Sequence, residues 1–373
     1  RQRQMCIRDS ICTNRTEGIM NSYHEALSQR SIEVVIRTAQ RGWSPRDLLH
    51  VLGTYCHPII YRAAGQVPAH VTSTVLRKDW LTLEPPTSMA MSTDQLVEFL
   101  QTINRLPRLS DVEALVAEKP EAASRKGKAE RIREKISGLL KKAESTPYEE
   151  EASALIAKAQ SLQNRYRLED SEGTASTAFV SRRIHISAPY INHKSTLLSV
   201  IADRNGCSAL QVHPKGIVSV FGTEEDIQHV VDLFGSLQRQ CDWHMRHGDH
   251  ASAARQSGNL ASFRRSFILA YAARIGEILD STNNSAPPAN GSVDPESSSA
   301  DEHSLMLMEK NLSVLDQRRR DAEAVRDFFF PNARTMSLSM GSRMGMSAGT
   351  TAADKSHLGG DSAGVNGRRQ LTG

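Results

Sequence analysis

The break at Ser145-Thr146-Pro147 restricts the fold of this chain more than any other feature of its sequence. It separates two segments in which apolar residues recur at helical spacing. Thr146 can cap the second segment, Pro147 suits its first helical position, and Glu149 completes a capping box. The pattern predicts two helices that fold back on each other as an antiparallel hairpin over residues 128–168. The two apolar stripes are Ile132, Ile136, Leu139, Leu140 and Ala143 before the break, and Ala152, Leu155, Ile156, Ala159, Leu162 and Tyr166 after it.

The same segment carries a family resemblance. The string KISGLLKKAESTPYEEEASALIAKAQSLQNRYRL resembles the family catalogued as domain of unknown function twenty-seven eighty-six, because the capped turn and both stripes match together. The resemblance covers about forty residues. It implies a helical hairpin, and it implies no reaction, because the family has no established activity.

Residues 178–280 change from purely helical patterns to a mixture. FVSRRIHISAPY and SALQVHPKGIVSVFG have the alternation typical of strands, and a His-Pro-Lys-Gly turn predicts a β-hairpin in the second. Helical patterns lie between and after them, one of them capped by Thr223. The order strand, helix, two strands, two helices predicts a small three-stranded α+β domain. This region resembles the companion family catalogued as domain of unknown function seventy-one sixty-eight, through its Val-Phe-Gly strand end, the capped helix and a Ser-Phe-x-x-x-Phe helix.

Residues 20–119 are predicted to form a separate helical domain. SIEVVIRTAQ ends before Gly42, and Ser44 and Pro45 are typical of the start of a second helix. Two helices joined in this way can be a DNA-binding helix-turn-helix or an ordinary helical corner. We expect residues 1–19 to be an assembly artefact or disordered, because RQRQMCIRDS resembles a translated adaptor remnant and Met20 is a plausible start.

Beyond the α+β domain, composition predicts three further segments. Residues 281–303 are rich in Ser, Pro, Asn and acidic residues, which indicates a disordered linker. Residues 304–330 have a helical pattern and are expected to dock on the α+β domain. Residues 331–373 are rich in Met, Ser and Gly and are expected to form a mobile tail.

From the sequence we expect a cytoplasmic protein with no membrane-spanning helix and no cofactor. The five cysteines are scattered and form no Cys-x-x-Cys pair, so we expect reduced thiols that serve as packing residues. The sequence contains no Walker loop, no dinucleotide-binding glycine motif and no His-Glu-x-x-His. The formal net charge is +4, of which the first ten residues contribute a net +2, so it says little about partners.

Basic residues gather before the hairpin turn. The segment from Arg125 to Ser145 has a net charge of +5. A strip of bases along one flank of the apolar stripe can contact the phosphates of DNA or RNA. It can also be a solvated rim that covers the seam and pairs with acids beyond the turn. The predicted nucleic-acid contacts are Lys126, Lys128, Arg131, Arg133 and Lys135.

A histidine cluster offers a weaker alternative. His244, His247 and His250 stand three residues apart in CDWHMRHGDH, so they could converge on zinc. Steps of three residues on a helix turn the end members away from each other, which favours a polar helix end. The chain is thus expected to be a mainly helical α+β protein and a non-enzymatic nucleic-acid-associated module. The alternatives are a protein-protein interaction or scaffold module and a metal-dependent hydrolase.

Overall fold

The computed structural model describes residues 2–68, 74–115, 131–132, 134–142, 155, 158–167, 178–248, 250–256, 258–284 and 298–356. The chain divides into two compact units, Arg1–Glu118 and Lys119–Gly373. The described part is mainly helical with a single three-stranded sheet, which confirms the predicted α+β class. The predicted reversal at residues 145–147 lies outside the described residues. Within the described residues, no helix is long and apolar enough to cross a membrane.

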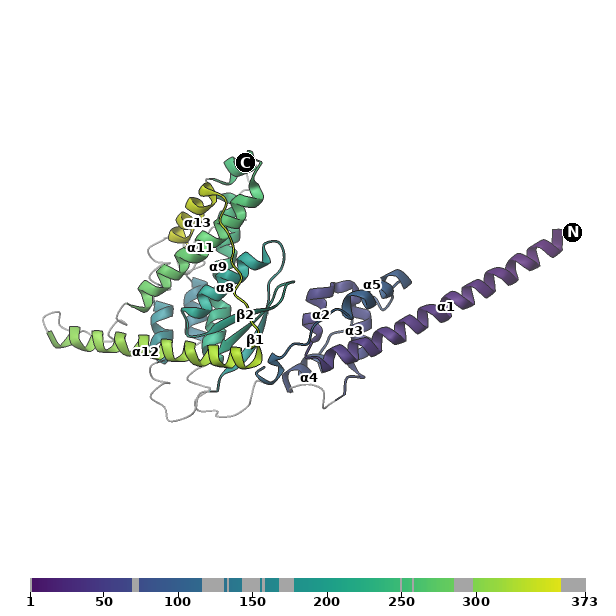
Figure 1. Cartoon of the computed structure of the whole chain (residues 1–373), viewed down its shortest axis with the longest axis horizontal. Coiled ribbons are helices and arrows are strands. Elements are labelled where there is room, and N and C mark those ends of the chain that lie inside the picture. Colours follow the sequence, from purple (N-terminus) through teal and green to yellow (C-terminus); the bar gives the residue numbers. More distant parts are fainter. Residues whose placement is uncertain are drawn as a thin grey trace. The chain divides into compact units, whose positions relative to one another are not determined.

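The first unit is helical, as predicted (Figure 1). Its helix α1 begins earlier than expected: residues 2–19 are helical, where we expected an artefact or disorder. Trp43, Leu48, Ile60, Trp80 and Phe99 are among the buried side chains of its core. The elements are α1 (Gln2–Gln40), α2 (Pro45–Leu52), a 3-10 turn (Thr54–Cys56), α3 (His57–Ala64), α4 (Thr74–Leu81), α5 (Thr93–Ile103) and a second 3-10 turn (Asp111–Glu113).

Local sequence explains how α2 begins. The Ser44 side chain accepts a hydrogen bond from the Asp47 backbone, and the Asp47 carboxylate accepts one from the Ser44 backbone, both at 3.0 Å. Gly42 has φ of +90°, a conformation that favours glycine in the turn before the cap. Five of the eight α2 residues are buried, and Arg46 is its exposed residue. A recognition helix needs several exposed side chains, so this geometry favours the helical corner.

The second unit is built around an antiparallel sheet of order β1-β3-β2. Its strands are β1 (Val180–His185), β2 (Ser208–His213) and β3 (Ile217–Gly222), and the last two form the predicted β-hairpin. Arg182 pairs with Val220, and Ser208 pairs with Phe221. Every residue of β3 is buried, because β3 is the central strand and both of its faces are covered.

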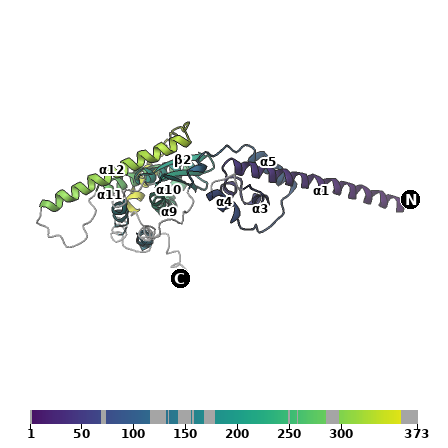
Figure 2. The same ribbon diagram turned by 90° about the horizontal axis from the view of Figure 1, so that it is seen from below.

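Helices cover the two faces of the sheet (Figure 2). On one face α8 (Ile191–Asp203), α9 (Glu224–His247) and α11 (Leu260–Asn283) pack into a shared apolar core. On the other face lies α12 (Ser298–Phe329), which places the Arg326 guanidinium 2.9 Å from the Ser208 hydroxyl. The ring of Phe330, directly after α12, contacts that of Phe221 edge to face at a centroid distance of 6.3 Å. The segment 304–330, expected to be a docking helix, thus contacts the sheet at its end, and the helix begins at Ser298, inside the segment predicted as a linker.

The prediction of a mobile tail is wrong for residues 343–355. They form α13 (Arg343–Lys355), which packs along α11. A Cβ atom at Gly349 would lie 2.3 Å from the backbone oxygen of Phe267, so the small residues on this face let the two backbones approach closely. The buried residues of α13 are Gly345, Ala348, Gly349, Ala352 and Ala353.

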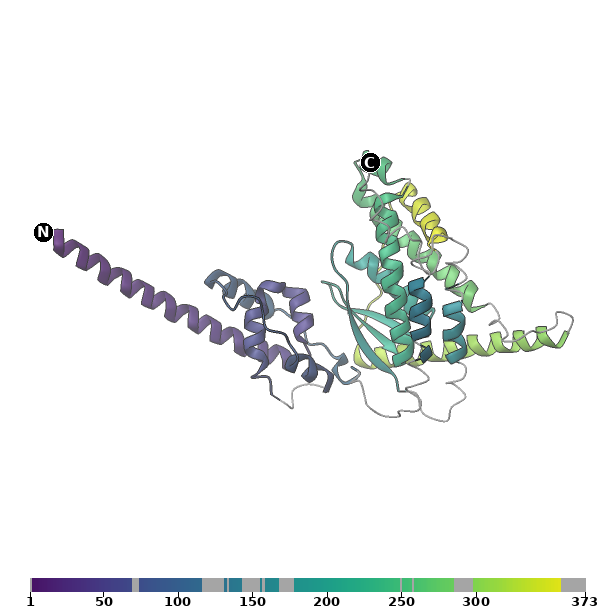
Figure 3. The same cartoon turned by 180° about the vertical axis from the view of Figure 1, so that it is seen from behind.

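The described parts of the helical hairpin pack into the same core. Residues 131–132 and 134–142 are helical, and so are residues 158–167, which lie beside α9 (Figure 3). Ile136, Leu140 and Ala159 belong to the buried cluster that also contains side chains of the sheet and α9. The described apolar residues of both predicted helices therefore pack into the core of the α+β domain.

Candidate functional site

The predicted nucleic-acid contacts can be placed in part. Arg131 and Lys135 are exposed, on the helix whose Ile136 and Leu140 are buried. Their side chains therefore stand on the solvent side of the hairpin, one helical turn apart. Glu134 is exposed on the same helix. Lys126, Lys128 and Arg133 lie outside the described residues.

The three histidines proposed as metal ligands do not converge. His244 is buried and meets the Trp243 ring edge to face at 5.0 Å. His247 and His250 are exposed, and a ring nitrogen of His247 lies 3.1 Å from the backbone oxygen of Trp243. Among the described residues, no group of three or more His, Cys, Asp or Glu side chains could hold a metal ion. Described Cys56, Cys207 and Cys241 are free thiols in buried positions, as expected.

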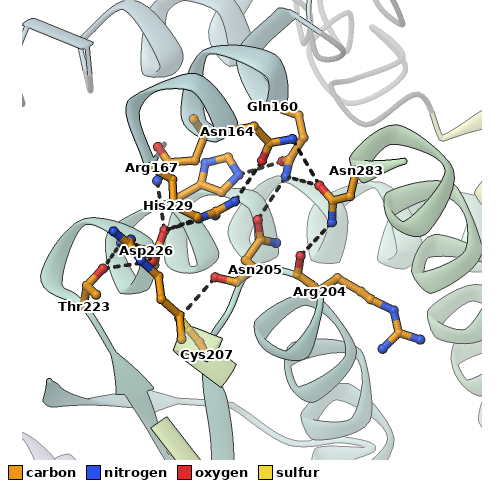
Figure 4. Close-up of polar contacts among 12 residues, drawn as sticks. Gln160, Asn164, Arg167, Arg204, Asn205, Cys207, Thr223, Asp226, His229 and Asn283 are labelled. Atoms are coloured by element: carbon orange, nitrogen blue, oxygen red, sulfur yellow. Dashed lines mark hydrogen bonds and ion pairs between the residues drawn. The ribbon is translucent and has the colours of Figure 1, made fainter. Parts of the chain in front are cut away.

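A buried polar network that the sequence patterns did not predict lies where the hairpin meets the α+β domain (Figure 4). Its centre is Asp226 at the start of α9, whose side chain is fully buried. The Arg167 guanidinium lies 3.0 Å from one carboxylate oxygen of Asp226, and the Arg318 guanidinium lies 2.6 Å from the other. The Thr223 hydroxyl donates to the same carboxylate at 2.9 Å. One acid thus joins the hairpin, the α9 cap and α12.

The charged groups of this network strongly shift the pKa values of their neighbours. Burial alone would raise the pKa of the Asp226 carboxyl, but the guanidinium groups of Arg167 and Arg318 outweigh burial and hold this pKa well below its usual range. Asp226 is therefore ionised at neutral and mildly acidic pH. Burial raises the pKa of the nearby Cys207 thiol well above its usual value, and the Asp226 charge adds to this effect. Cys207 is thus a neutral packing residue rather than a nucleophile.

Side-chain amides also link Gln160 of the hairpin to Asn205 and to Asn283 at the end of α11. The Asn205 amide donates to the backbone oxygen of Ile201 at 2.9 Å, and the Asn283 amide donates to that of Arg204 at 2.8 Å. Each of these donations turns the side-chain oxygen of the asparagine toward Gln160. The Gln160 amide donates to both oxygens at 3.1 Å. Backbone carbonyls therefore determine which end of Gln160 is the acceptor.

The orientation of Gln160 in turn determines the tautomer of His229. The Gln160 side-chain oxygen lies 2.9 Å from the Nε2 atom of His229. Because that oxygen can only accept, Nε2 carries the proton and the Nδ1 atom of the neutral ring is an acceptor. Burial lowers the pKa of His229 to about 4, and the Arg167 charge contributes. The ring is therefore neutral at physiological pH.

The Nδ1 atom of His229 is buried and has no hydrogen-bond partner among the described residues. His229 also lines a shallow pocket between the hairpin and α9, whose space of about 310 Å³ includes open solvent. Ile132, Ile136, Gln163, Tyr166, Glu225, Gln228 and Asp232 complete the lining. His229, two carboxylates and apolar side chains thus line the same pocket.

The sequence did contain a signal for the hairpin side of this network. Gln160, Gln163, Asn164 and Arg167 stand at i, i+3, i+4 and i+7, the spacing of one helical face, and the most exposed of them is only 5% exposed. A polar stripe at the spacing expected for core residues indicates buried partners. The partners Asn205, Asp226 and Asn283 carry no comparable pattern, because they lie in separate elements.

The comparisons with known proteins give a family match in the hairpin segment. No curated protein and no solved structure matches the chain. Residues 131–170 match the model of a family described as a protein of unknown function, DUF2786. This part of the chain, which supplies one side of the polar network, is therefore similar to that family.

Proposed function

We propose that the chain is a cytoplasmic, non-enzymatic protein that associates with DNA or RNA through the solvent side of its hairpin. The observation that carries the proposal is the exposure of Arg131 and Lys135 on a helix whose Ile136 and Leu140 are buried. Packing uses the apolar face of that helix and leaves these two bases in water, at a spacing that suits neighbouring phosphates. Lys126, Lys128 and Arg133 belong to the same proposed surface.

Such a surface recognises charge rather than sequence. Contacts to phosphate oxygens orient a protein on nucleic acid but carry no base information. We therefore expect similar affinity for unrelated sequences. Affinity is expected to fall with salt, with a slope in log affinity against log salt of roughly −0.9 per phosphate contacted on duplex DNA.

The test is titration of labelled duplex DNA and single-stranded RNA with the full chain at low and moderate salt. The double variant Arg131→Glu/Lys135→Glu is expected to weaken binding to all sequences and to flatten the salt slope. The matched control is Arg105→Glu/Arg108→Glu, which makes the same charge change at two exposed residues of the first unit. Equal weakening by both variants would assign the effect to net charge, and absence of binding at low salt would refute the proposal.

The interaction or scaffold module is the alternative that absence of binding would favour. Its bases would then be a solvated rim. The apolar faces of the hairpin are already occupied by the α+β domain, which weighs against a partner protein on those faces. Capture of partners from the native host with the full chain is the next experiment in that case.

The metal-dependent hydrolase has less support, because it depends on the convergence of His244, His247 and His250. Elemental analysis of the purified protein tests it directly. We expect no stoichiometric zinc, and near-stoichiometric zinc that a His247→Ala change removes would make this function the leading one.

The order of strands and helices over residues 178–280 supports a further proposal, that this region corresponds to the companion family catalogued as domain of unknown function seventy-one sixty-eight. The capped α9 and the Phe263 and Phe267 pair in α11 are the features on which it rests.

A further inference from the structure

We infer that the end of α9 and the following α10 (Ala251–Gln256) bind single-stranded nucleic acid, with a base stacked on the Trp243–His247 pair and phosphates held by the arginines beside it. The inference extends the proposed association with DNA or RNA to a second surface, and it uses no residue of the hairpin. It rests on a group of exposed arginines, on a shortage of acids around them and on an aromatic pair among them.

One face of α9 combines arginines with aromatic rings. Arg239, Trp243, Arg246 and His247 stand at i, i+4, i+7 and i+8, the spacing of a single helical stripe. Trp243 is half-buried, and the other three residues are exposed. The stripe therefore faces solvent, while the buried side chains of α9 pack into the core.

The helix α10 adds another arginine to this face. The Arg255 guanidinium donates a hydrogen bond to the backbone oxygen of Arg246 at 2.7 Å, which holds the exposed Arg255 side chain at the end of α9. Residues 239–265 contain five arginines and two acids, a net charge of +3. One of these acids, Asp242, lies 3.8 Å from the Lys194 ammonium group, so its charge is already balanced in part. The surface therefore attracts an anionic chain.

The aromatic pair provides a group on which a base can stack. The ring centroids of Trp243 and His247 lie 5.3 Å apart, with 30° between the ring planes. A ring nitrogen of His247 lies 3.1 Å from the Trp243 backbone oxygen, which keeps the exposed His247 ring on the indole. Unpaired bases stack on aromatic side chains in this way, because every base has a flat face. Bases in a duplex already stack on one another, so the pair favours a single strand.

Other anionic partners fit this surface less well. In the described part of the chain, the exposed large apolar side chains all lie outside α9 and α10, so a lipid surface would find no apolar anchor here. An acidic peptide would pair with the arginines but would leave the stacked rings unused. The occupant is therefore a single strand of DNA or RNA.

Tryptophan fluorescence of the full chain tests this inference. The chain has three tryptophans, and Trp43 and Trp80 are buried in the core of the first unit, so a ligand at α9 acts on the emission of Trp243. The probe is oligouridylate, and the controls are the same strand paired with oligoadenylate, and poly-glutamate, each at equal charge. We expect oligouridylate to quench the emission in a saturable manner and both controls to quench it much less. Trp243→Phe should remove the response.

Further variants separate this surface from the hairpin. His247→Ala removes one ring of the pair and is expected to weaken oligouridylate binding at least about fivefold. Arg246→Glu/Arg255→Glu changes two exposed positions and should also weaken it. The hairpin variant Arg131→Glu/Lys135→Glu should still show quenching at saturation.

The outcomes distinguish the two surfaces. Binding that only the hairpin variant weakens would overturn this inference and retain the hairpin proposal, and binding that only the α9 and α10 variants weaken would do the reverse. Absence of quenching by oligouridylate would overturn the inference whatever the hairpin variant does. Equal quenching by the duplex or by poly-glutamate would also overturn it, because it would report charge rather than stacking of a base.

Discussion

Arg167 and Asp226 form an ion pair at 3.0 Å in which both side chains are fully buried. They lie 59 positions apart, one in the hairpin and one in the first turn of α9. A buried pair of this kind adds little stability over an apolar pair, but removal of one partner leaves a charge without compensation. We therefore expect the pair to specify where the hairpin docks more than it determines how stable the domain is.

Loss of Arg167 should strongly destabilise the second unit. Arg167→Met leaves Asp226 with Arg318 as its remaining ion-pair partner in the network, and we expect a loss of about 3–5 kcal/mol in the free energy of unfolding. Urea unfolding measures it. Arg131→Met in the same hairpin is the control, with an expected change within about 0.5 kcal/mol because Arg131 is exposed. Similar effects of the two variants would contradict the buried network.

Stability should fall in mildly acidic solution because of His229. Its pKa is about 4 in the folded state against the ordinary 6.5, so the unfolded state binds the proton first as the pH falls. This contribution is complete above about pH 6.5 and is lost progressively down to about pH 4, on the order of 3 kcal/mol in total. Asp226 stays ionised throughout this window.

The His229→Gln variant isolates this effect. A glutamine amide can still donate to Gln160 but does not titrate. We expect the variant to show a shallower decline of unfolding free energy between pH 6.5 and 4 than the parent protein, measured by urea unfolding at each pH. An unchanged decline would assign it to other groups.

Two glycine substitutions should have opposite effects on stability. Gly349 of α13 packs closely on α11, whereas Gly138 of the hairpin has open space beside it. Gly349→Ala places a methyl group against the Phe267 backbone and should cost about 1–3 kcal/mol in docking of α13, seen as faster proteolysis within residues 331–356. Gly138→Ala meets no atom within 4 Å and should instead stabilise its helix by up to about 1 kcal/mol. Proteolysis unaffected by Gly349→Ala would mean that α13 does not dock as described.

Two helix caps in the first unit should differ in strength. Ser44 and Ser92 form the same capping box, but Ser44 is 4% exposed whereas Ser92 lies in a solvent-accessible position. Each change to alanine should cost about 1 kcal/mol for the lost cap. Ser44→Ala should cost more, because water cannot replace the bond to the buried Asp47 backbone. Thermal unfolding of both variants makes the comparison, and an equal loss would contradict it.

Much of the local structure could be predicted from the sequence. The caps at Ser44 and Thr223, the β-hairpin around Gly216 and the apolar stripes of the helical hairpin all depend on residues within a few positions of one another. Short-range hydrogen bonds and helical periodicity decide such features, so they are visible without a structure. The exposure of Arg131 and Lys135 follows from the same periodicity.

The sequence by itself determined the capped starts of α2 and α9, the β-hairpin and the apolar faces of the helical hairpin, and tertiary structure decided how the polar faces are used. Gln160 and Arg167 became core residues only because Asn205, Asp226 and Asn283 arrive from elements that lie 45 to 123 positions away. The small residues around Gly349 were visible as a tail composition, but their burial depends on the backbone of Phe267. Partners of this kind are selected by packing between distant elements, and no local pattern encodes them.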